Sequence, residues 1–220
     1  MRSVAEFARV NTASAGITLV DARSWITARE AKALSDAFPD TIPLYDSKYV
    51  LFDSRRALAE RDRSDSAENH YFRTPKLQQL AAKMRQAMLE TLPEKQRFCE
   101  GMSPWAVLLA RSNGAARAGD DQHFHVHSWG MVATLSLLGP GSVAKVAAED
   151  FSSLGDREVG QKADAFAGHV FEAPTRWVSI FDRAHFANGG LHAAPVRHGS
   201  YPERFTLIVT LFTHLDRQTR

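Results

Sequence analysis

Residues 121 to 129 read Asp-Gln-His-Phe-His-Val-His-Ser-Trp, and this stretch holds three of the nine histidines of the chain. In an extended strand, side chains two positions apart point to the same face. His123, His125 and His127 would therefore present their imidazoles side by side. Three imidazoles packed together without a ligand would need several other hydrogen-bond partners. Because imidazole suits zinc, copper, iron and nickel, the spacing favours a metal site.

A second histidine-containing stretch, His-Ala-Ala-Pro-Val-Arg-His-Gly, occupies residues 192 to 199. His192 can complete a triangle of imidazoles if its strand lies beside the strand that carries His125 and His127. We therefore predict that His125, His127 and His192 bind a metal. A shifted register, in which His123 and His125 are the ligands of the first strand, stays open at this point.

Apolar segments that are typical of β-strands dominate the chain from Pro104 onward. The second of them ends at Gly139-Pro140-Gly141, which is a strong turn signal. The last is the longest, and it begins with Arg204. The predicted strands cover residues 105–110, 130–138, 176–181 and 204–213.

The first hundred residues show mainly helical patterns. Thr27 and Glu30 have the spacing of a capping box, which predicts a helix that reaches about Phe38. Thr74-Pro75 begins the clearest helix, whose apolar residues recur at helical spacing, with Met84 and Met88 among them. We interpret the two methionines as core packing. Further predictions are strands at residues 16–21 and 47–53, a solvated helix or loop at 55–69, and either a mobile lid or a surface excursion at 145–174.

Helices that come first and strands that come later predict an α+β fold, in which a helical layer supports a β-sandwich or barrel. The length of 220 residues suits a single domain, residues 1–220. Within it we expect residues 1–100 to be mainly helical support with edge strands. Residues 104–213 would form the β core that carries the metal site.

Composition excludes several classes of protein. The chain is 44% hydrophobic and 24% charged, with a formal net charge of +2, so bulk charge indicates neither a nucleic-acid nor a membrane partner. No segment approaches the roughly 20 apolar residues of a membrane span. The single cysteine, Cys99, excludes both an internal disulfide and a cysteine-rich zinc site. It fits a reducing compartment, and we expect a cytoplasmic protein.

The two histidine stretches, taken with Arg204 and the strand that follows it, resemble the Fe(II)/2-oxoglutarate-dependent oxygenases. The resemblance covers about residues 105–212 and is strongest over residues 192–211, where histidine, Pro-Val, glycine, arginine and an apolar strand follow in order. It implies a double-stranded β-helix core, of the jelly-roll or cupin-like type, with an N-terminal helical layer. It further implies that His125 and His192 bind Fe(II), while Arg204 and Thr206 bind 2-oxoglutarate. Phe124 matches the aromatic residue that often precedes the family's first ligand, which favours His125 over His123.

The chain departs from the family at one ligand. Where these oxygenases carry aspartate or glutamate, this sequence has His127. His127 either binds the metal itself, which gives a neutral three-histidine site, or leaves a position to be filled by another group. Related halogenases lack the carboxylate and have a small residue there, whereas His127 would crowd that space. Asp182, just after a predicted strand, is a candidate carboxylate from elsewhere in the chain.

The resemblance implies an enzyme that uses O₂ and 2-oxoglutarate to hydroxylate or otherwise oxidise an unactivated C–H bond of a small molecule. The arginine fits this role chemically, because a planar guanidinium grips a carboxylate with two parallel hydrogen bonds. Two alternatives remain. One is a three-histidine dioxygenase or oxidase of the same barrel that does not use 2-oxoglutarate. The other is a non-catalytic barrel that binds a metal in a closed coordination shell. The sequence leaves the substrate and the oligomeric state open.

Overall fold

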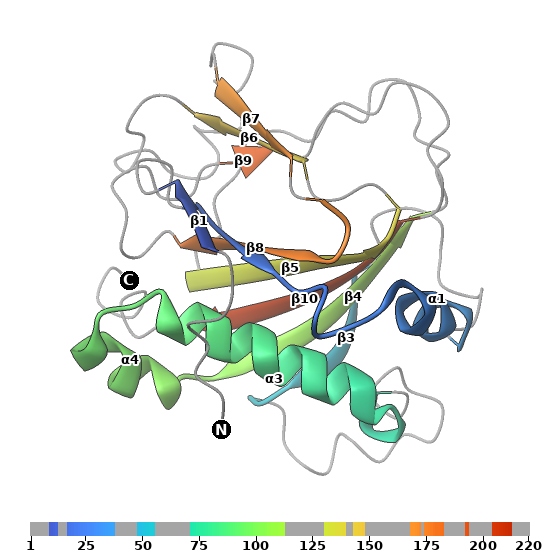
Figure 1. Cartoon of the computed structure of the whole chain (residues 1–220). Helices are drawn as coiled ribbons and strands as arrows, with labels where there is room; N and C mark the ends of the chain where they lie inside the picture. Colours follow the sequence, from blue (N-terminus) through green and yellow to red (C-terminus); the bar gives the residue numbers. More distant parts are fainter. Residues whose placement is uncertain are drawn as a thin grey trace.

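The computed structural model describes residues 9–12, 17–37, 48–55, 71–112, 130–139, 143–147, 168–172, 174–182, 192–193 and 204–212. These residues form two antiparallel sheets and a layer of helices (Figure 1). The helices are α1 (Ala28–Ala37), α3 (Pro75–Glu90) and α4 (Glu94–Gly101). Of the helices in this described part, none is long and apolar enough to cross a membrane.

The large sheet has seven strands in the order β1-β2-β8-β5-β10-β4-β3. Every neighbouring pair in it is antiparallel. The long strands β5 and β10 lie near its centre, and β10 pairs with both β4 and β5. In sheet order, the strands are β1 (Arg9–Thr12), β2 (Ile17–Asp21), β8 (Trp177–Asp182), β5 (Gly130–Leu138), β10 (Arg204–Phe212), β4 (Trp105–Ser112) and β3 (Lys48–Asp53).

The small sheet has three strands in the order β7-β6-β9. They are β7 (Gly168–Glu172), β6 (Val143–Ala147) and β9 (His192–Ala193). In Figure 1 this sheet lies over one side of the large sheet, whereas α3 crosses the other side. From β5 onward the chain alternates between the sheets, since β5, β8 and β10 belong to the large one and β6, β7 and β9 to the small one. Two facing antiparallel sheets with such crossings are typical of jelly rolls.

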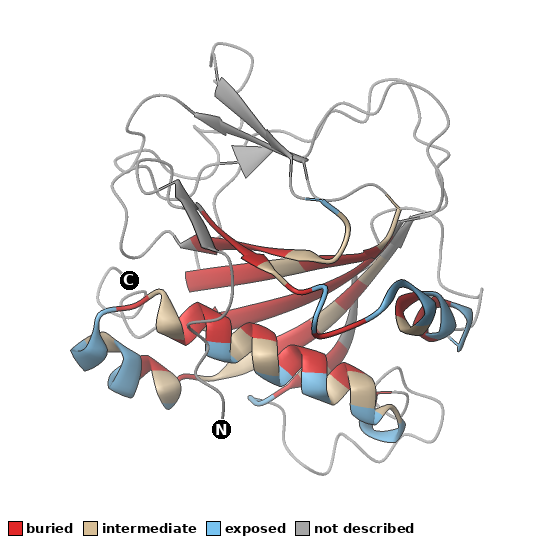
Figure 2. Ribbon diagram, viewed as in Figure 1, coloured by how far each residue is buried: buried red, intermediate tan, exposed pale blue. Residues whose placement is uncertain are grey.

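The two faces of β10 differ in chemistry. Phe205, Leu207, Val209 and Leu211 are fully buried in the main hydrophobic cluster, together with the inner residues of α3 (Figure 2). Because side chains alternate along a strand, the residues between them point to the opposite face. We call the face that packs against α3 the core face of the large sheet. Burial of this apolar surface is the main stabilising contribution to the fold.

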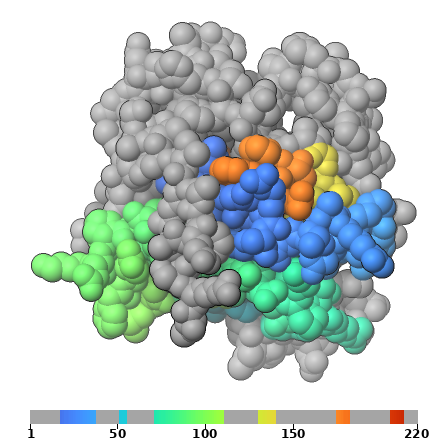
Figure 3. All heavy atoms as spheres, in the orientation of Figure 1, coloured from blue at the N-terminus to red at the C-terminus, as the bar shows by residue number. Residues whose placement is uncertain are grey.

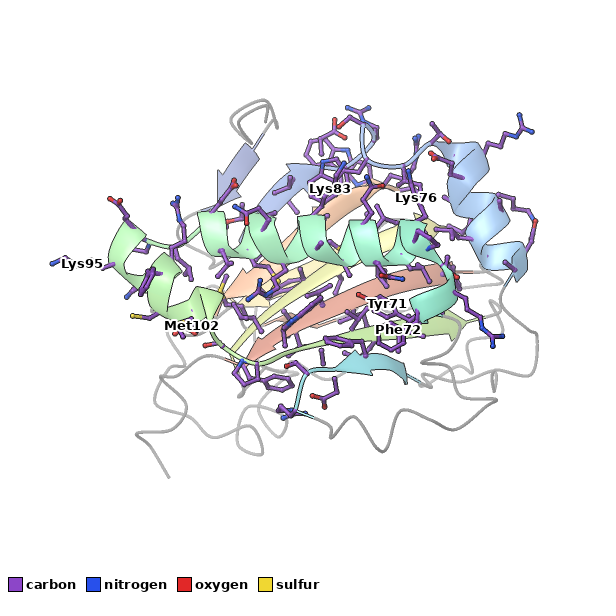
Figure 4. The ribbon with its side chains drawn as sticks, turned by 90° about the horizontal axis from the view of Figure 1, so that it is seen from below. Tyr71, Phe72, Lys76, Lys83, Lys95 and Met102 are labelled. Carbon is purple, nitrogen blue, oxygen red and sulfur yellow. The ribbon has the colours of Figure 1, made fainter. Side chains whose placement is uncertain are left out.

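Helix α1 is fixed to α3 by one carboxylate. The backbone N–H of Thr27 donates to Glu30 Oε2 at 2.7 Å, and the Glu30 N–H donates to Thr27 Oγ1 at 3.2 Å, so the predicted capping box is present. Lys76 on α3 donates to Glu30 Oε1 at 2.8 Å. These bonds, the Lys76 bond first, lower the pKa of Glu30 to about 2. Figures 3 and 4 show the two helices side by side on the outside of the sheet, with Lys76 near α1.

The strands predicted at residues 16–21, 47–53, 105–110, 130–138, 176–181 and 204–213 are all present within two residues of those bounds. Met84 and Met88 are fully buried on α3, which confirms their interpretation as core packing. The structure adds β1, β6, β7, β9 and α4, which the patterns did not predict. Strands β6 and β7 coincide in part with the predicted lid or surface excursion at 145–174. The charged run, apart from Arg55, lies outside the described residues.

Candidate functional site

The predicted site residues fall on both described and undescribed parts of the chain. His123, His125 and His127 lie outside the described residues. His192 begins β9, where its backbone pairs with Val146 of β6. Arg204 begins β10, opposite Ser112 of β4. Across the described ranges, no group of three His, Cys, Asp or Glu residues is placed to hold a metal ion.

Thr206 is the predicted site residue whose side chain is described, and it is 5% exposed on the face opposite the core face. The register puts Ala110 of β4 on one side of it and Ser136 of β5 on the other. Ser136 is fully buried, and its hydroxyl donates to the Leu138 carbonyl oxygen at 3.2 Å. The beginning of β10 therefore has a hydroxyl-bearing neighbour on the same face.

More hydroxyl groups follow on this face along β10. Ile208 lies opposite Thr134 of β5, and Thr134 lies opposite Ser179 of β8. Thr210 is the next residue of β10 on the same side, and it is buried. We call this surface the hydroxyl face. Its members are Thr134, Ser136, Ser179, Thr206 and Thr210.

Buried hydroxyl groups cost free energy unless they are hydrogen-bonded. The core face of the same strands carries only apolar side chains at the corresponding positions. Hydrogen-bond partners are therefore needed on the hydroxyl face and not on the core face. The hydroxyl face also carries the buried apolar residues Val132, Phe181 and Ile208, and its hydroxyl groups are suited to hydrogen-bonding a polar ligand. Thr206 lies on it at the beginning of β10, between β4 and β5.

A β-bulge lies at the beginning of β10. Two residues of β5, Leu137 and Leu138, are accommodated opposite Phe205, because Phe205 pairs with Leu138 and Thr206 already pairs with Ser136. Bulges bend a strand and re-aim its side chains, and they are frequent beside functional sites. The extra residue of this bulge is in β5, opposite the part of β10 that carries Arg204 and Thr206, the two residues predicted to bind 2-oxoglutarate.

The large sheet has two ends that matter for the site. Arg204, Ser112 and Leu138 mark one end, which we call the Arg204 end. Phe212 and Gly130 pair at the other, which we call the Gly130 end. Eight residue steps along β10 separate them, which is about 27 Å at the rise of an antiparallel strand.

The strands that neighbour the predicted metal ligands in the sequence can be related to these ends. Strands β4 and β5 both run antiparallel to β10, so β4 finishes at the Arg204 end while β5 starts at the Gly130 end. His125 and His127 directly precede the start of β5 in the sequence. Strand β8 also finishes at the Gly130 end, where Asp182 lies opposite Met131, and β9 follows it with His192. These are relations in the sequence alone, since His125 and His127 lie outside the described residues.

An arginine that the patterns did not single out lies at the Gly130 end. Arg55 donates from Nε to Asp53 Oδ1 at 3.0 Å and from Nη2 to Asp53 Oδ2 at 2.7 Å. Its backbone N–H also donates to Asp53 Oδ1, at 2.9 Å. The guanidinium carbon lies 3.7 Å from the centroid of the Phe212 ring. Hydrogen bonding to Asp53 raises the pKa of Arg55, so this group is a permanent cation.

The same motif recurs at the Arg204 end. Asp21 accepts from the backbone N–H and the Nε of Arg23, both at 2.9 Å, and the guanidinium carbon of Arg23 lies 5.7 Å from the Trp177 ring centroid. The side-chain bond from Arg23 lowers the pKa of Asp21. In the sequence, both pairs could have been recognised from an Asp-x-Arg pattern at the end of a predicted strand. We call them strand-end clamps, one formed by Asp21 and Arg23 and the other by Asp53 and Arg55.

No protein-family model matches this sequence, and a comparison with curated proteins found no match either. Solved structures do resemble it. A dioxygenase for auxin oxidation from rice is 12% identical, with a TM-score of 0.50 over 91% of this chain and 74% of that one. A Pseudomonas putida prolyl-4-hydroxylase is 14% identical, with a TM-score of 0.43 over 90% and 92%. HygX from Streptomyces hygroscopicus, solved with nickel and 2-oxoglutarate, is 10% identical, with a TM-score of 0.47 over 89% and 81%.

At 12% identity, the likeness to the rice dioxygenase concerns the fold alone. It agrees with the two antiparallel sheets and the helical layer described above. Activity and ligands have to be argued from the site itself.

Proposed function

We propose that this chain is a non-heme iron oxygenase with a double-stranded β-helix core, which uses O₂ and 2-oxoglutarate to oxidise a C–H bond of a small molecule. The observation that carries the proposal is the position of Thr206. It lies buried at the beginning of β10, two residues after Arg204, on a face lined with hydroxyl groups between the two sheets. An arginine and a threonine in that arrangement suit the carboxylate of a dicarboxylic acid.

In this proposal Fe(II) is held by His125, His127 and His192. The donor set fits the metal, because imidazole is a common ligand of iron. Arg204 pairs with the far carboxylate of 2-oxoglutarate, and the Thr206 hydroxyl donates to the same group. The bound iron and cosubstrate supply the oxidising chemistry, while the protein binds, orients and excludes water.

His127 supports a second candidate function. With three neutral imidazoles the metal centre carries one more positive charge than it does with a carboxylate ligand, and the excess charge favours an anionic substrate bound directly to the metal. In that case the enzyme is a three-histidine dioxygenase or oxidase without 2-oxoglutarate, and Arg204 binds the substrate instead.

Anaerobic titration of the Fe(II)-loaded protein with 2-oxoglutarate separates the two functions. Chelation of the iron by the keto acid produces a visible metal-to-ligand charge-transfer band. We expect the band in the wild-type protein and in Thr210→Val, which alters the hydroxyl face far from Arg204. We expect it to require at least tenfold more 2-oxoglutarate in Arg204→Ala, because a charged hydrogen-bonded pair contributes about 1.5 to 3 kcal/mol.

Metal binding is measured separately, by the stoichiometry of bound Fe(II) in the wild-type protein and in His192→Ala. Iron that binds without any charge-transfer band supports the three-histidine enzyme. A protein that binds no iron, or binds it equally in His192→Ala, is inconsistent with both functions and leaves a non-catalytic barrel.

A further inference from the structure

We propose that Thr134 determines which 2-oxo diacid this enzyme accepts, because its side chain forms the floor of the space that holds the cosubstrate. The inference rests on the proposed function and deepens it, since it takes the far carboxylate of the diacid to lie at Arg204 and Thr206. Thr134 belongs to β5, which is hydrogen-bonded to β10 beside Thr206.

Thr134 differs in exposure from the residues around it. It is partly exposed, although it lies in the middle of β5. Its partners across the strands are Ser179 of β8 and Ile208 of β10, which are 2% and 9% exposed. Its neighbours along β5 on the same face, Val132 and Ser136, are buried as well. The surface of the hydroxyl face is therefore open at Thr134 and closed around it.

This opening is confined to one position of the three central strands. Within the described residues 131–137, 178–181 and 205–211, which are the interior parts of β5, β8 and β10, every residue apart from Thr134 is buried. A residue in the middle of a sheet is left open only where the layer that covers the sheet leaves a gap. The gap over Thr134 therefore belongs to the space between the two sheets and not to a sheet edge.

The spacing along the strands suits a five-carbon diacid. Thr206 lies opposite Ser136, and Thr134 lies two residues further from the Arg204 end, which is about 7 Å at the rise of an antiparallel strand. The four carbon–carbon bonds that join the carboxyl carbons of 2-oxoglutarate span about 5 Å when extended. A diacid that is anchored at Thr206 and extends along the sheet away from Arg204 therefore reaches the opening over Thr134.

The size of the side chain at position 134 then limits the room for the diacid. A methionine there would fill the opening, whereas an alanine would deepen it. A diacid with one more methylene group has to bend between its two ends, and the bend needs room over this residue. Valine has nearly the shape of threonine but no hydroxyl group, so Thr134→Val separates the effect of size from that of hydrogen bonding.

The test compares 2-oxoglutarate with 2-oxoadipate, which is longer by one methylene group. The wild-type protein, Thr134→Met, Thr134→Ala and the shape-matched control Thr134→Val are loaded with Fe(II) under anaerobic conditions. Isothermal titration calorimetry gives the dissociation constant of each acid, and the charge-transfer band reports whether the bound acid chelates the iron. Thermal unfolding without ligand identifies a variant that does not fold.

We expect the wild-type protein and Thr134→Val to bind 2-oxoglutarate with similar dissociation constants, and 2-oxoadipate at least about tenfold more weakly, which is the usual effect of one methylene group in a fitted pocket. Thr134→Met should lose at least about tenfold in affinity for 2-oxoglutarate. In Thr134→Ala the ratio of the two dissociation constants should move at least fivefold toward 2-oxoadipate. A general loss of stability would not change this ratio.

The inference is overturned if the wild-type protein binds both acids equally well, if a folded Thr134→Met binds 2-oxoglutarate as the wild-type protein does, or if Thr134→Ala leaves the ratio unchanged. Equal losses in Thr134→Val and Thr134→Met would also overturn it, because they would assign the effect to the hydroxyl group. If Thr134→Met does not fold, the ratio in Thr134→Ala decides. A wild-type protein that binds neither acid refutes the proposed function before any variant is compared.

Discussion

Replacing Thr206 with valine removes one hydroxyl group from the hydroxyl face and leaves the shape of the side chain almost unchanged. Thr206 is 5% exposed, and its neighbours across the strands are Ala110 and Ser136. In the proposed enzyme its hydroxyl donates to the carboxylate of 2-oxoglutarate. We therefore expect Thr206→Val to weaken 2-oxoglutarate binding while the protein stays folded.

The expected size of the effect follows from the chemistry of the lost bond. A hydrogen bond to a charged group contributes about 1.5 to 3 kcal/mol. At about 1.4 kcal/mol for each factor of ten, the dissociation constant of 2-oxoglutarate should rise about 10- to 100-fold. The free energy of unfolding without ligand should change by no more than about 1 kcal/mol, because valine replaces threonine at similar volume.

The adjacent residue, Leu207, provides the opposite control. It is fully buried on the core face, so Leu207→Ala should lower the free energy of unfolding by about 2 to 5 kcal/mol. For a chain of this size that corresponds to a melting temperature about 4 to 20 °C lower. Thr210→Val controls for the loss of any hydroxyl from the hydroxyl face, since Thr210 lies about 14 Å further along β10.

The assay pairs the anaerobic charge-transfer titration with thermal unfolding of the same four proteins. The reasoning holds if Thr206→Val alters mainly the titration, Leu207→Ala alters mainly unfolding, and Thr210→Val alters neither strongly. It is refuted if Thr206→Val binds 2-oxoglutarate as the wild-type protein does, or if Thr210→Val weakens binding equally. Either result would mean that the hydroxyl face does not hold the cosubstrate at Thr206.

Three further predictions concern stability. Because the folded-state pKa of Glu30 is lowered to about 2, the stabilisation from its charge is present above about pH 4.5 and is lost as the pH falls toward 2. The difference in melting temperature between the wild-type protein and Glu30→Gln should therefore narrow between pH 6 and pH 3. A constant difference would contradict this prediction. Arg176 has a φ of 64°, a backbone conformation in which L residues are strained. In urea unfolding, the free energy of unfolding of Arg176→Gly should lie within about 1 kcal/mol of the wild-type value, and that of Arg176→Val should be lower than that of Arg176→Gly. Equal stability of the two variants would argue against strain. Met84→Ala should lower the free energy of unfolding by about 2 to 5 kcal/mol. Replacement of the exposed Gln79 by alanine should lower it by less than about 0.5 kcal/mol. Similar values for both variants would mean that Met84 is not in the core.

Most individual helices and strands could be predicted from local sequence patterns. Helix α3 follows from apolar residues at helical spacing after Thr74-Pro75, and α1 follows from its capping box. The apolar segments that became β4, β5, β8 and β10 were also recognised. These signals are local, because helical and strand periodicity act within a few residues of the chain.

The missed elements depend on distant partners. Strands β6 and β7 lie in a glycine-containing region with weak periodicity, and β9 has only two residues. Their hydrogen bonds come from each other across the small sheet. Short strands of this kind are stabilised by pairing, so their own residues carry little signal.

The sequence by itself determined the chemistry that is available: three closely spaced histidines, His192, and Arg204 followed by Thr206 at the start of a long apolar strand. The tertiary structure decided that Thr206 faces a buried row of hydroxyl groups, and that Arg55 lies against Phe212 at the other end of the same sheet. Pairing between strands that are far apart in the sequence sets which side chains share a face. The alternation of apolar residues selects the face that is buried, whereas the pairing of distant strands decides which residues meet on the other face.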